Sequence, residues 1–332
     1  MNILYITRAN LSFSRAHTQN ILKTVEALQR SGESVELVAK SDTLALFAMV
    51  IKKRAVFDVL YFRDPYIWWM AWVARFVLHK KVIFEVHGSH EWRMGAPFWR
   101  VALMASTAAV FITKKLAEYY GYQKPFAVTH TSGVELDSFS MSPETLNNLR
   151  ASLGLSSEVP VLMYAGSFLW YDIQVLLKMM LQLKHHAQLV VVGAKAYEER
   201  ELQMLSKSLG VSERVYIVGR VTPAALPPYL LIADILLNPL KISYPSSISS
   251  KLYEYLAAGK AIVSARGGAN DEVIENDRNG VLLDGVDPTI WARTIDALLD
   301  DSVRLRQLGD AARQDSLRYT WDTRAKSIKA LL

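Results

Sequence analysis

The chain has 332 residues, of which 51% are hydrophobic and 21% charged; it contains no cysteine, and its formal net charge is +6. A single hydrophobic core stops growing at roughly 250–300 residues, so the length predicts two domains. The composition excludes a disordered chain. The absence of cysteine excludes disulfides and thiolate metal sites, and it favours a reducing compartment.

The charge is unevenly distributed along the chain. Residues 1–157 contain 18 lysines and arginines against 12 acidic residues, whereas residues 158–332 contain 20 of each. A basic first half indicates contact with an anionic surface. The alternative is that six charges spread over this length reflect chance.

The first half alternates strand-length apolar runs with longer helical segments. Residues 2–7 have no basic region before them, so they predict a first strand rather than a signal peptide. Residues 18–30 place apolar side chains on one helical face. The expected strands are residues 2–7, 34–39, 57–62, 81–87 and 109–113. Apolar runs of this kind, with helices between them, predict a parallel sheet in an α/β fold.

A second series of strands follows a polar segment at residues 142–160. These strands are expected at residues 159–167, 188–194, 214–220, 233–239, 260–265 and 280–284. The pattern predicts two facing Rossmann-like, doubly wound domains with a cleft between them, where ligands bind beyond the carboxyl ends of the strands. We expect an N-terminal domain over residues 1–155 and a C-terminal domain over residues 156–317. A helix at about 318–332 is expected to pack back on the first domain.

Charged residues and glycines lie between the apolar runs of residues 246–274. A helix is expected to begin at Lys251, after Ser249 or Ser250 as its N-cap, and its free N–H groups favour a bound phosphate. Lys251 would neutralise a diphosphate, and the carboxylate of Glu254, one turn further on, suits vicinal ribose hydroxyls. The alternative is a capped helix with a surface Lys–Glu pair.

Gly267 and Gly268 follow the next strand after a single residue, Arg266, and are expected to open another helix. Glycines at such a turn let backbone amides approach an anion closely. Two successive strands would then each lead into an anion-binding helix end at the same edge of the sheet.

Four segments resemble the retaining, nucleotide-sugar-dependent glycosyltransferases of family 4 (glycosyl transferases group 1), which have the GT-B fold. The segments are SGVELDSF at 132–139, KLYEYLAAGKAIV at 251–263, GGANDEVI at 267–274 and NGVLL at 279–283. The resemblance implies a hexosyl- or other glycosyltransferase that moves a sugar from a nucleoside diphosphate sugar to an acceptor hydroxyl with retention of configuration.

The resemblance also implies which residues act. Glu254 would bind the ribose and His87 would reach the donor sugar near its reacting carbon, so these two are the candidate catalytic residues. The alternatives for His87 are a strand-end histidine that caps a turn, or a metal site shared with His90 and Glu91. The candidate donor-binding residues are Gly166, Ser167, Arg220, Ser246, Ser250, Lys251, Glu254, Gly267, Gly268, Asn270 and Glu272.

The chain departs from the family pattern at the phosphate site. Ser167 and Tyr171 stand where the family usually has an arginine and a lysine, and each lost charge-assisted hydrogen bond is worth about 1.5–3 kcal/mol. Compensation for this loss is expected from Lys251, Arg220 or Arg15.

Two further departures concern the donor sugar and the acceptor. Ser246 replaces a glutamate that usually contacts the donor sugar, and on the acceptor side Arg15 and His17 replace a Gly-Gly turn. No Asp-x-Asp triplet occurs, so we expect neither a metal nor another cofactor. Helix ends and cations would stabilise the leaving group electrostatically.

Aromatic and basic residues gather in one part of the first half. They are Trp68, Trp69, Trp72, Arg75, His79, Lys80, Lys81, Trp92, Arg93, Trp99 and Arg100. Such a mixture is typical of a membrane interface. The alternative is a helix that packs on the sheet and extends its basic groups to solvent.

These patterns predict a cytoplasmic enzyme, peripheral at the inner face of the cell membrane, that builds a cell-surface polysaccharide or glycolipid. The expected partners are a nucleotide sugar, a glycan or lipid-linked acceptor and an anionic membrane surface. Nucleic acid is not expected, because it does not explain the glycine-rich helix ends. Two alternatives remain: a catalytically weak GT-B homologue that serves as a binding subunit of a glycan assembly complex, and a GT-B sugar-nucleotide epimerase.

Overall fold

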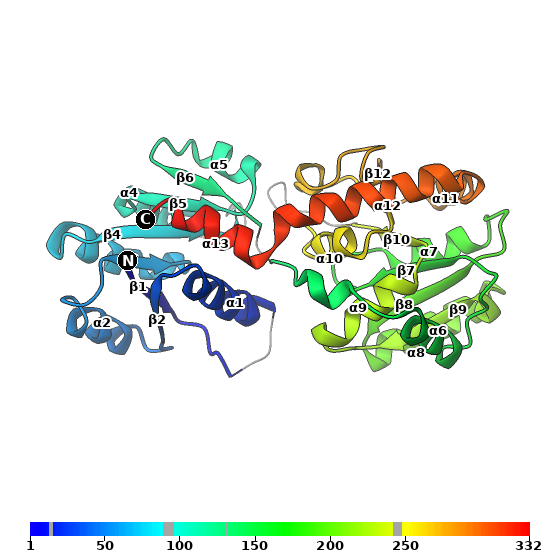
Figure 1. Ribbon diagram of the computed structural model, residues 1–332, viewed down its shortest axis with the longest axis horizontal. Helices are drawn as coiled ribbons and strands as arrows, with labels where there is room; N and C mark the ends of the chain where they lie inside the picture. The colour runs from blue at the N-terminus through cyan, green and yellow to red at the C-terminus, as the bar shows by residue number, and fades with distance from the viewer. Residues whose placement is uncertain (13–15, 89–95, 131, 242–247) are drawn as a thin grey trace. The chain divides into compact units, whose positions relative to one another are not determined.

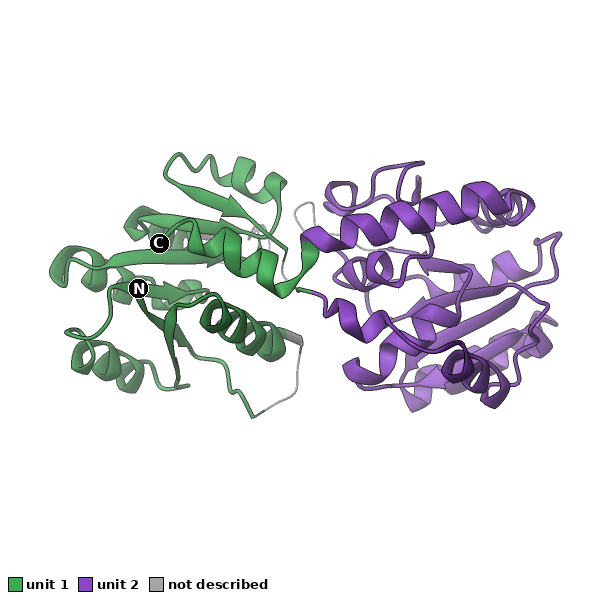
Figure 2. Cartoon of the chain, in the orientation of Figure 1, with its two compact units in different colours: residues 1–133, 319–332 green, residues 134–318 purple. Residues whose placement is uncertain are grey.

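The computed structural model describes residues 1–12, 16–88, 96–130, 132–241 and 248–332. The chain divides into two compact units (Figure 2). Unit 1 comprises Met1–Gly133 with Tyr319–Leu332, and unit 2 comprises Val134–Arg318. This division lies before the boundary after residue 155 that the sequence suggests. The helix α6 (Pro143–Ser152) belongs to unit 2, where it contacts α9 (Leu226–Ile232).

Unit 1 is built on a parallel sheet with the strand order β2-β1-β3-β4-β5-β6 (Figure 1). Its strands are β1 (Asn2–Thr7), β2 (Ser34–Ala39), β3 (Val59–Phe62), β4 (Lys81–Val86), β5 (Ala108–Phe111) and β6 (Phe126–Val128). The first five confirm the sequence prediction. The edge strand β6 has only three residues, and Phe126 and Val128 are exposed, so it lacks the apolar run that marks the others.

Six helices of unit 1 cover the two faces of this sheet. They are α1 (Ala16–Arg30), α2 (Thr43–Lys52), α3 (Trp68–Trp72), α4 (Ala96–Ala105), α5 (Lys114–Tyr120) and α13 (Trp321–Lys329). Side chains alternate along β1, so that Ile3 and Tyr5 pack with α1 and α13, while Leu4 and Ile6 pack with the other four helices. The last helix of the chain is therefore part of the core of unit 1, beside α1.

Unit 2 repeats this plan with the strand order β12-β11-β10-β7-β8-β9, also fully parallel. Its strands are β7 (Val161–Ala165), β8 (Gln188–Ala194), β9 (Val215–Gly219), β10 (Ile235–Asn238), β11 (Ala261–Ala265) and β12 (Val281–Leu283). Its further helices are α7 (Ile173–Met180), α8 (Ala196–Ser208), α10 (Lys251–Ala258), α11 (Pro288–Asp300) and α12 (Ser302–Ser316). All six strands lie within the ranges predicted from sequence.

The order of the strands identifies where each sheet is suited to bind a ligand. In unit 2 the chain runs outward from β7 through β8 to β9, and outward from β10 through β11 to β12 in the opposite direction. The crevice beyond the carboxyl ends of β7 and β10 is therefore a topological switch point, which is the usual ligand site of doubly wound sheets.

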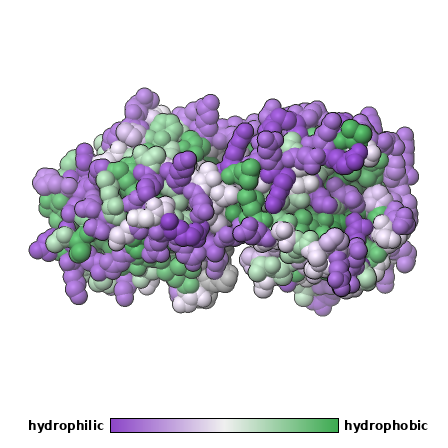
Figure 3. Space-filling model, in the orientation of Figure 1, coloured by the Kyte–Doolittle hydropathy of each residue, from purple (hydrophilic) through white to green (hydrophobic). Residues whose placement is uncertain are grey.

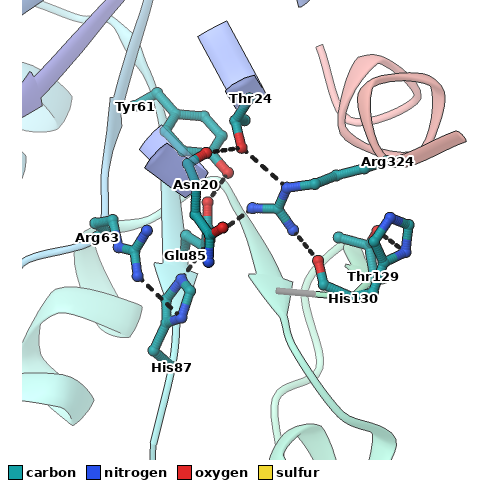
Figure 4. A network of polar contacts seen from close by, with 9 residues as sticks. All are labelled: Asn20, Thr24, Tyr61, Arg63, Glu85, His87, Thr129, His130 and Arg324. Carbon is teal, nitrogen blue, oxygen red and sulfur yellow. Dashed lines mark hydrogen bonds and ion pairs between the residues drawn. The ribbon is translucent and has the colours of Figure 1, made fainter. Parts of the chain in front are cut away.

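A buried ion pair fastens α13 to the sheet of unit 1 (Figure 4). Arg324 on α13 is 1% exposed, and its Nη2 lies 2.6 Å from Oε1 of Glu85 on β4, which is 0% exposed. The same guanidinium donates through Nε to Thr24 Oγ1 at 3.1 Å and through Nη1 to the carbonyl oxygen of His130. Burial alone would raise the pKa of Glu85, but Arg324 and His87 hold it well below its usual range.

We expect Arg324→Met to destabilise unit 1 strongly, because it leaves the Glu85 carboxylate buried without its cation. Breaking one side of a buried pair costs about 3–5 kcal/mol. A matched control on the same helix is Lys329→Met, which removes a 46% exposed lysine that pairs with Glu33 and should cost at most about 1 kcal/mol. Urea unfolding of the two variants measures the difference, and equal losses would show that the buried pair is not special.

Candidate functional site

A pocket of about 440 Å³ lies at the switch point of unit 2. Several of its lining residues follow β7 directly, and others belong to the start of α10. The pocket is lined by Ala165, Gly166, Ser167, Trp170, Tyr171, Leu226, Leu240, Ile248, Ser249, Ser250, Lys251 and Glu254. Of the predicted donor-binding residues, the structure therefore brings together Gly166, Ser167, Ser250, Lys251 and Glu254.

Two glycines allow the backbone and a lysine to approach closely beside this pocket. Gly166 has φ +138°, and a Cβ atom on it would lie 2.8 Å from Nζ of Lys251. Gly193 in β8 has φ +107°, and a Cβ atom there would lie 2.6 Å from the carbonyl oxygen of Gly166. Any side chain at either position would have to displace these neighbours, so the loop after β7 depends on both glycines.

Lys251 reaches the pocket from the first turn of α10 and is only 8% exposed. Its Nζ lies 3.8 Å from the ring centroid of Tyr164 and 3.4 Å from that of Tyr171. Within the described residues this Nζ is buried and has no hydrogen-bond partner. Burial lowers the pKa of Lys251 well below its usual range, although Glu254 acts in the opposite direction. The two aromatic faces supply the main local attraction for the ammonium group.

Glu254 lies one turn further along α10 and is also withdrawn from solvent. Burial raises the pKa of its carboxyl group to about 7, and Lys251 lowers that pKa only in part. The described residues include no ion pair between the two side chains. The arrangement is therefore a partly buried carboxyl group beside a caged lysine, and the alternative of a surface Lys–Glu pair is wrong.

The start of α10 differs from the predicted serine cap. Ser250 is the N-cap residue, but its side chain makes no capping hydrogen bond. The backbone N–H of Ser249 instead donates to Oδ1 of Asn270 at 2.9 Å. Asn270 is 0% exposed and so links the segment after β11 to the start of α10. Its role in the structure is to hold these two loops together.

The glycine pair after β11 does not open a second α-helix, which corrects the sequence prediction. The segment forms a single 3₁₀ turn at Asn270–Glu272. The side chain of Asn279 ends it, because Oδ1 accepts from the N–H of Glu275 at 2.8 Å and Nδ2 donates to the carbonyl oxygen of Val273 at 3.1 Å. Gly280 follows because a Cβ atom there would lie 2.9 Å from the side chain of Ile274. The NGVLL segment thus has a packing role.

The remaining predicted donor-binding residues lie outside the pocket or outside the described chain. Arg220 is exposed after β9, which is separated from β7 by β8. Gly267, Gly268 and Glu272 do not line the pocket. Ser246, like Arg15, His90 and Glu91, lies outside the described residues.

His87 follows β4 in unit 1, and both of its ring nitrogens have partners there (Figure 4). Nε2 contacts Oε1 of Glu85, and Nδ1 lies 3.1 Å from Nη2 of Arg63. A guanidinium can only donate and an ionised carboxylate can only accept, so His87 is neutral with its proton on Nε2. Burial and Arg63 lower the pKa of His87 to about 4, although Glu85 acts against them. A contact from His87 to a sugar would have to replace one of these partners.

His17, the other described acceptor-side candidate, belongs to the start of α1. Burial and Arg63 lower its pKa, while Glu85 and Asp64 raise it. Arg63 therefore contacts His87 and lowers the pKa of both histidines, although no sequence motif singles it out. The available signal is its position, since Arg63 directly follows the buried strand β3.

The tryptophans proposed for a membrane interface mostly belong to the core. Trp99 is 4% exposed and its ring lies 5.4 Å from that of Phe84, so its assignment to an interface is wrong. Trp68, Trp69 and Trp72 are partly buried against the same core. On the face shown in Figure 3, hydrophobic areas are interspersed with hydrophilic ones in both units. No helix in the described part of the chain is long and apolar enough to cross a bilayer.

Two six-stranded parallel sheets, each doubly wound with its own helices, define the GT-B fold. Similar solved structures include HepE from Anabaena in complex with UDP, with a TM-score of 0.83 and 18% identity over 99% of each chain. A glycosyltransferase from Rickettsia africae also has a TM-score of 0.83, with 17% identity over 99% of this chain and 97% of that one. At these identities the likeness shows the fold alone.

Sequence comparisons also identify the family to which the chain belongs. Residues 159–301, all within unit 2, match the family model of Glycosyl transferases group 1. A D-inositol 3-phosphate glycosyltransferase of Xylanimonas cellulosilytica is 33% identical over 236 residues, which are 68% of this chain and 56% of that protein. A second protein of that name from Catenulispora acidiphila is 29% identical over 64% of this chain and 51% of its own length. The chain thus spans about half the length of these relatives.

We expect His87 to stay neutral with its proton on Nε2 throughout pH 5–8, because its pKa is lowered to about 4. Long-range ¹H–¹⁵N NMR of the histidine rings measures both the tautomer and the titration. Arg63→Met should raise the pKa of His87 by removing a nearby cation, whereas the exposed Arg75→Met should leave it unchanged. Titration of the unmodified His87 near pH 6.5 would contradict the assigned geometry.

Proposed function

We propose that the chain is a glycosyltransferase that moves a sugar from a nucleoside diphosphate sugar to an acceptor hydroxyl, with retention of configuration. The single observation that carries the proposal is the Lys251 ammonium group, buried without a polar partner in the described residues, at the switch-point pocket of a GT-B unit. Burying an unpaired charge is costly, and an anionic ligand would relieve that cost.

The pocket residues suit the parts of such a donor. The diphosphate would lie between the Gly166 loop and the start of α10, where backbone N–H groups and Lys251 offset its charge. Glu254 would accept hydrogen bonds from the ribose hydroxyls. The leaving diphosphate would then be stabilised electrostatically by Lys251 and the start of α10, without a metal ion or other cofactor.

The ligands of the named proteins support this proposal and suggest which nucleotide to test first. The HepE crystal structures contain UDP or UDP-glucose, so UDP is the first nucleotide to test. The acceptor in this proposal is a glycan or lipid-linked saccharide, and the product a cell-surface polysaccharide or glycolipid.

A binding subunit without efficient transfer is the second candidate function. Ser167 and Tyr171 replace the two cations that the family usually has at the diphosphate, and Lys251 is covered by two rings. Hydrolysis of the nucleotide sugar without acceptor separates the candidates, because a transferase releases sugar slowly whereas a pure binding subunit releases none. A sugar-nucleotide epimerase would instead change the sugar without releasing it.

Contact with an anionic membrane surface is a further part of the proposal. Phe76, Val77 and Met104 are large apolar side chains of unit 1 that are 53%, 66% and 61% exposed. The exposed Arg75 precedes Phe76. Burial lowers the pKa of the Lys124 amine, and the positive charge of Arg75 lowers it further. Apolar groups beside basic ones suit the headgroup region.

Glu254→Ala should weaken binding of UDP by roughly tenfold to a hundredfold, because a hydrogen bond to a charged group is lost. Calorimetric titration in buffer containing EDTA measures this and at the same time tests binding without metal. The matched control is Glu213→Ala, an exposed glutamate of unit 2 outside the pocket. Failure of UDP, GDP and ADP to bind the unmodified protein would reject the proposed function.

The unmodified protein should co-sediment with vesicles that contain phosphatidylserine at low salt and be released as salt screens the basic groups. Replacing both Phe76 and Val77 by serine should reduce this binding, whereas Leu181→Ser, at an exposed leucine of unit 2, should not. If the protein ignores such vesicles at low salt, the membrane proposal fails.

A further inference from the structure

The ammonium group of Lys251 cannot touch a ligand in the arrangement that the structure shows. Its Nζ is buried, lying between the rings of Tyr164 and Tyr171 and against the Cα side of Gly166. The lysine therefore lies beside the place where a phosphate would approach, but the two rings cover it. We call Tyr164 and Tyr171 the tyrosine cage.

The two rings of the cage are held differently. Tyr164 is 0% exposed within β7, and its hydroxyl donates to the carbonyl oxygen of Ser167. Tyr171 is partly exposed, lines the pocket, and hydrogen-bonds through its hydroxyl to Ser249. The backbone on both sides of Tyr171 is fixed, because Asp172 N donates to Pro239 O at 2.9 Å and Lys241 N donates to Trp170 O at 2.9 Å. The side chain of Tyr171 can therefore turn aside only if its hydroxyl gives up the hydrogen bond to Ser249.

We propose that Tyr171 sets the affinity of the pocket for diphosphate groups, because it covers Lys251 until a diphosphate draws the ammonium group out of the tyrosine cage. This inference rests on the proposed function, since it concerns the same nucleotide site. A ligand without an anionic group cannot replace the attraction between the Lys251 ammonium group and the two aromatic faces. The covered lysine therefore lowers the affinity for nucleoside diphosphates and leaves the affinity for nucleosides unchanged, so the preference between them is smaller than an exposed lysine would give.

The charges around the cage agree with this exchange. The titratable groups that face Lys251 are Glu254 on its own helix, Tyr164 from β7 and Tyr171 from the loop, and Glu198 acts on Tyr164 from α8. Glu254 attracts the lysine but forms no ion pair with it in the described part of the chain. Among the residues that the structure describes, no carboxylate is therefore bonded to the ammonium group when a diphosphate approaches. Burial makes the caged charge costly, which favours its transfer to an anion.

The experiment compares Tyr171→Leu, which removes the aromatic face, with Tyr171→Phe, which keeps it. Without the face, Lys251 is released more easily, so Tyr171→Leu should bind UDP and inorganic pyrophosphate about three- to thirtyfold more tightly than the unmodified protein. Tyr171→Phe should stay within about threefold of the unmodified protein, because the attraction comes from the ring. Uridine should bind all three proteins alike.

A second pair of variants tests whether the effect passes through the lysine. In a Lys251→Met background, Tyr171→Leu should no longer change the affinity for UDP, because there is no ammonium group to release. An equal gain in this background would overturn the proposal, and so would weaker or unchanged UDP binding by Tyr171→Leu in the unmodified background.

Two controls keep these outcomes interpretable. Circular dichroism verifies folding, and Tyr171→Met carries the same test if the leucine variant does not fold. If the unmodified protein binds neither UDP nor pyrophosphate, the proposed function fails together with this inference. If it binds UDP and Tyr171→Leu gains nothing, only the role of Tyr171 is wrong.

Discussion

Glu85 is a carboxylate with no exposed surface in the sheet of unit 1, and it stays charged because the Arg324 guanidinium lies 2.6 Å away. The surrounding polar groups depend on that charge. The hydroxyl of Tyr61 donates a hydrogen bond to Glu85, and His87 is turned so that its Nε2 faces Glu85. Arg63 then finds the unprotonated Nδ1 of His87 as its acceptor. The orientations of Tyr61, His87 and Arg63 are therefore linked to the pair of Glu85 and Arg324.

In unit 2 the buried charged group is a cation, Lys251, and no carboxylate forms an ion pair with it within the described residues. The positive-φ glycines at 166 and 193 bring β8 and the segment after β7 into backbone contact and leave room for Lys251. Aromatic faces replace the missing anion, and burial lowers the pKa of the lysine. The two units therefore differ in how a buried charge is neutralised. In unit 1 the Glu85 carboxylate is paired with Arg324, whereas in unit 2 the Lys251 ammonium group can still pair with a negatively charged ligand.

The doubly wound fold of both units was predictable, because long apolar runs mark buried parallel strands without any tertiary information. β6 was missed because a three-residue edge strand with exposed side chains has no such run. The prediction of a helix after Gly268 was wrong, because the side chain of the later residue Asn279 makes the hydrogen bonds that end the turn.

The candidate site was predictable only where a local motif marks it, as for Lys251 and Glu254. The pair of Glu85 and Arg324 is separated by 239 positions, so no local pattern could reveal it. The assignment of Trp99 to a membrane interface was wrong for a similar reason, since the sequence shows the number of tryptophans but not how deeply each is packed.

The position of Arg324 also fixes an order of events during biosynthesis. A ribosome adds about 5–20 residues each second, so the 239 positions between Glu85 and Arg324 correspond to roughly ten to fifty seconds of translation. Throughout that interval the nascent unit 1 contains an acid whose compensating base has not yet been made. Unit 1 therefore reaches its final state only after all of unit 2 has left the peptidyl transferase centre, although most of its residues are synthesised first.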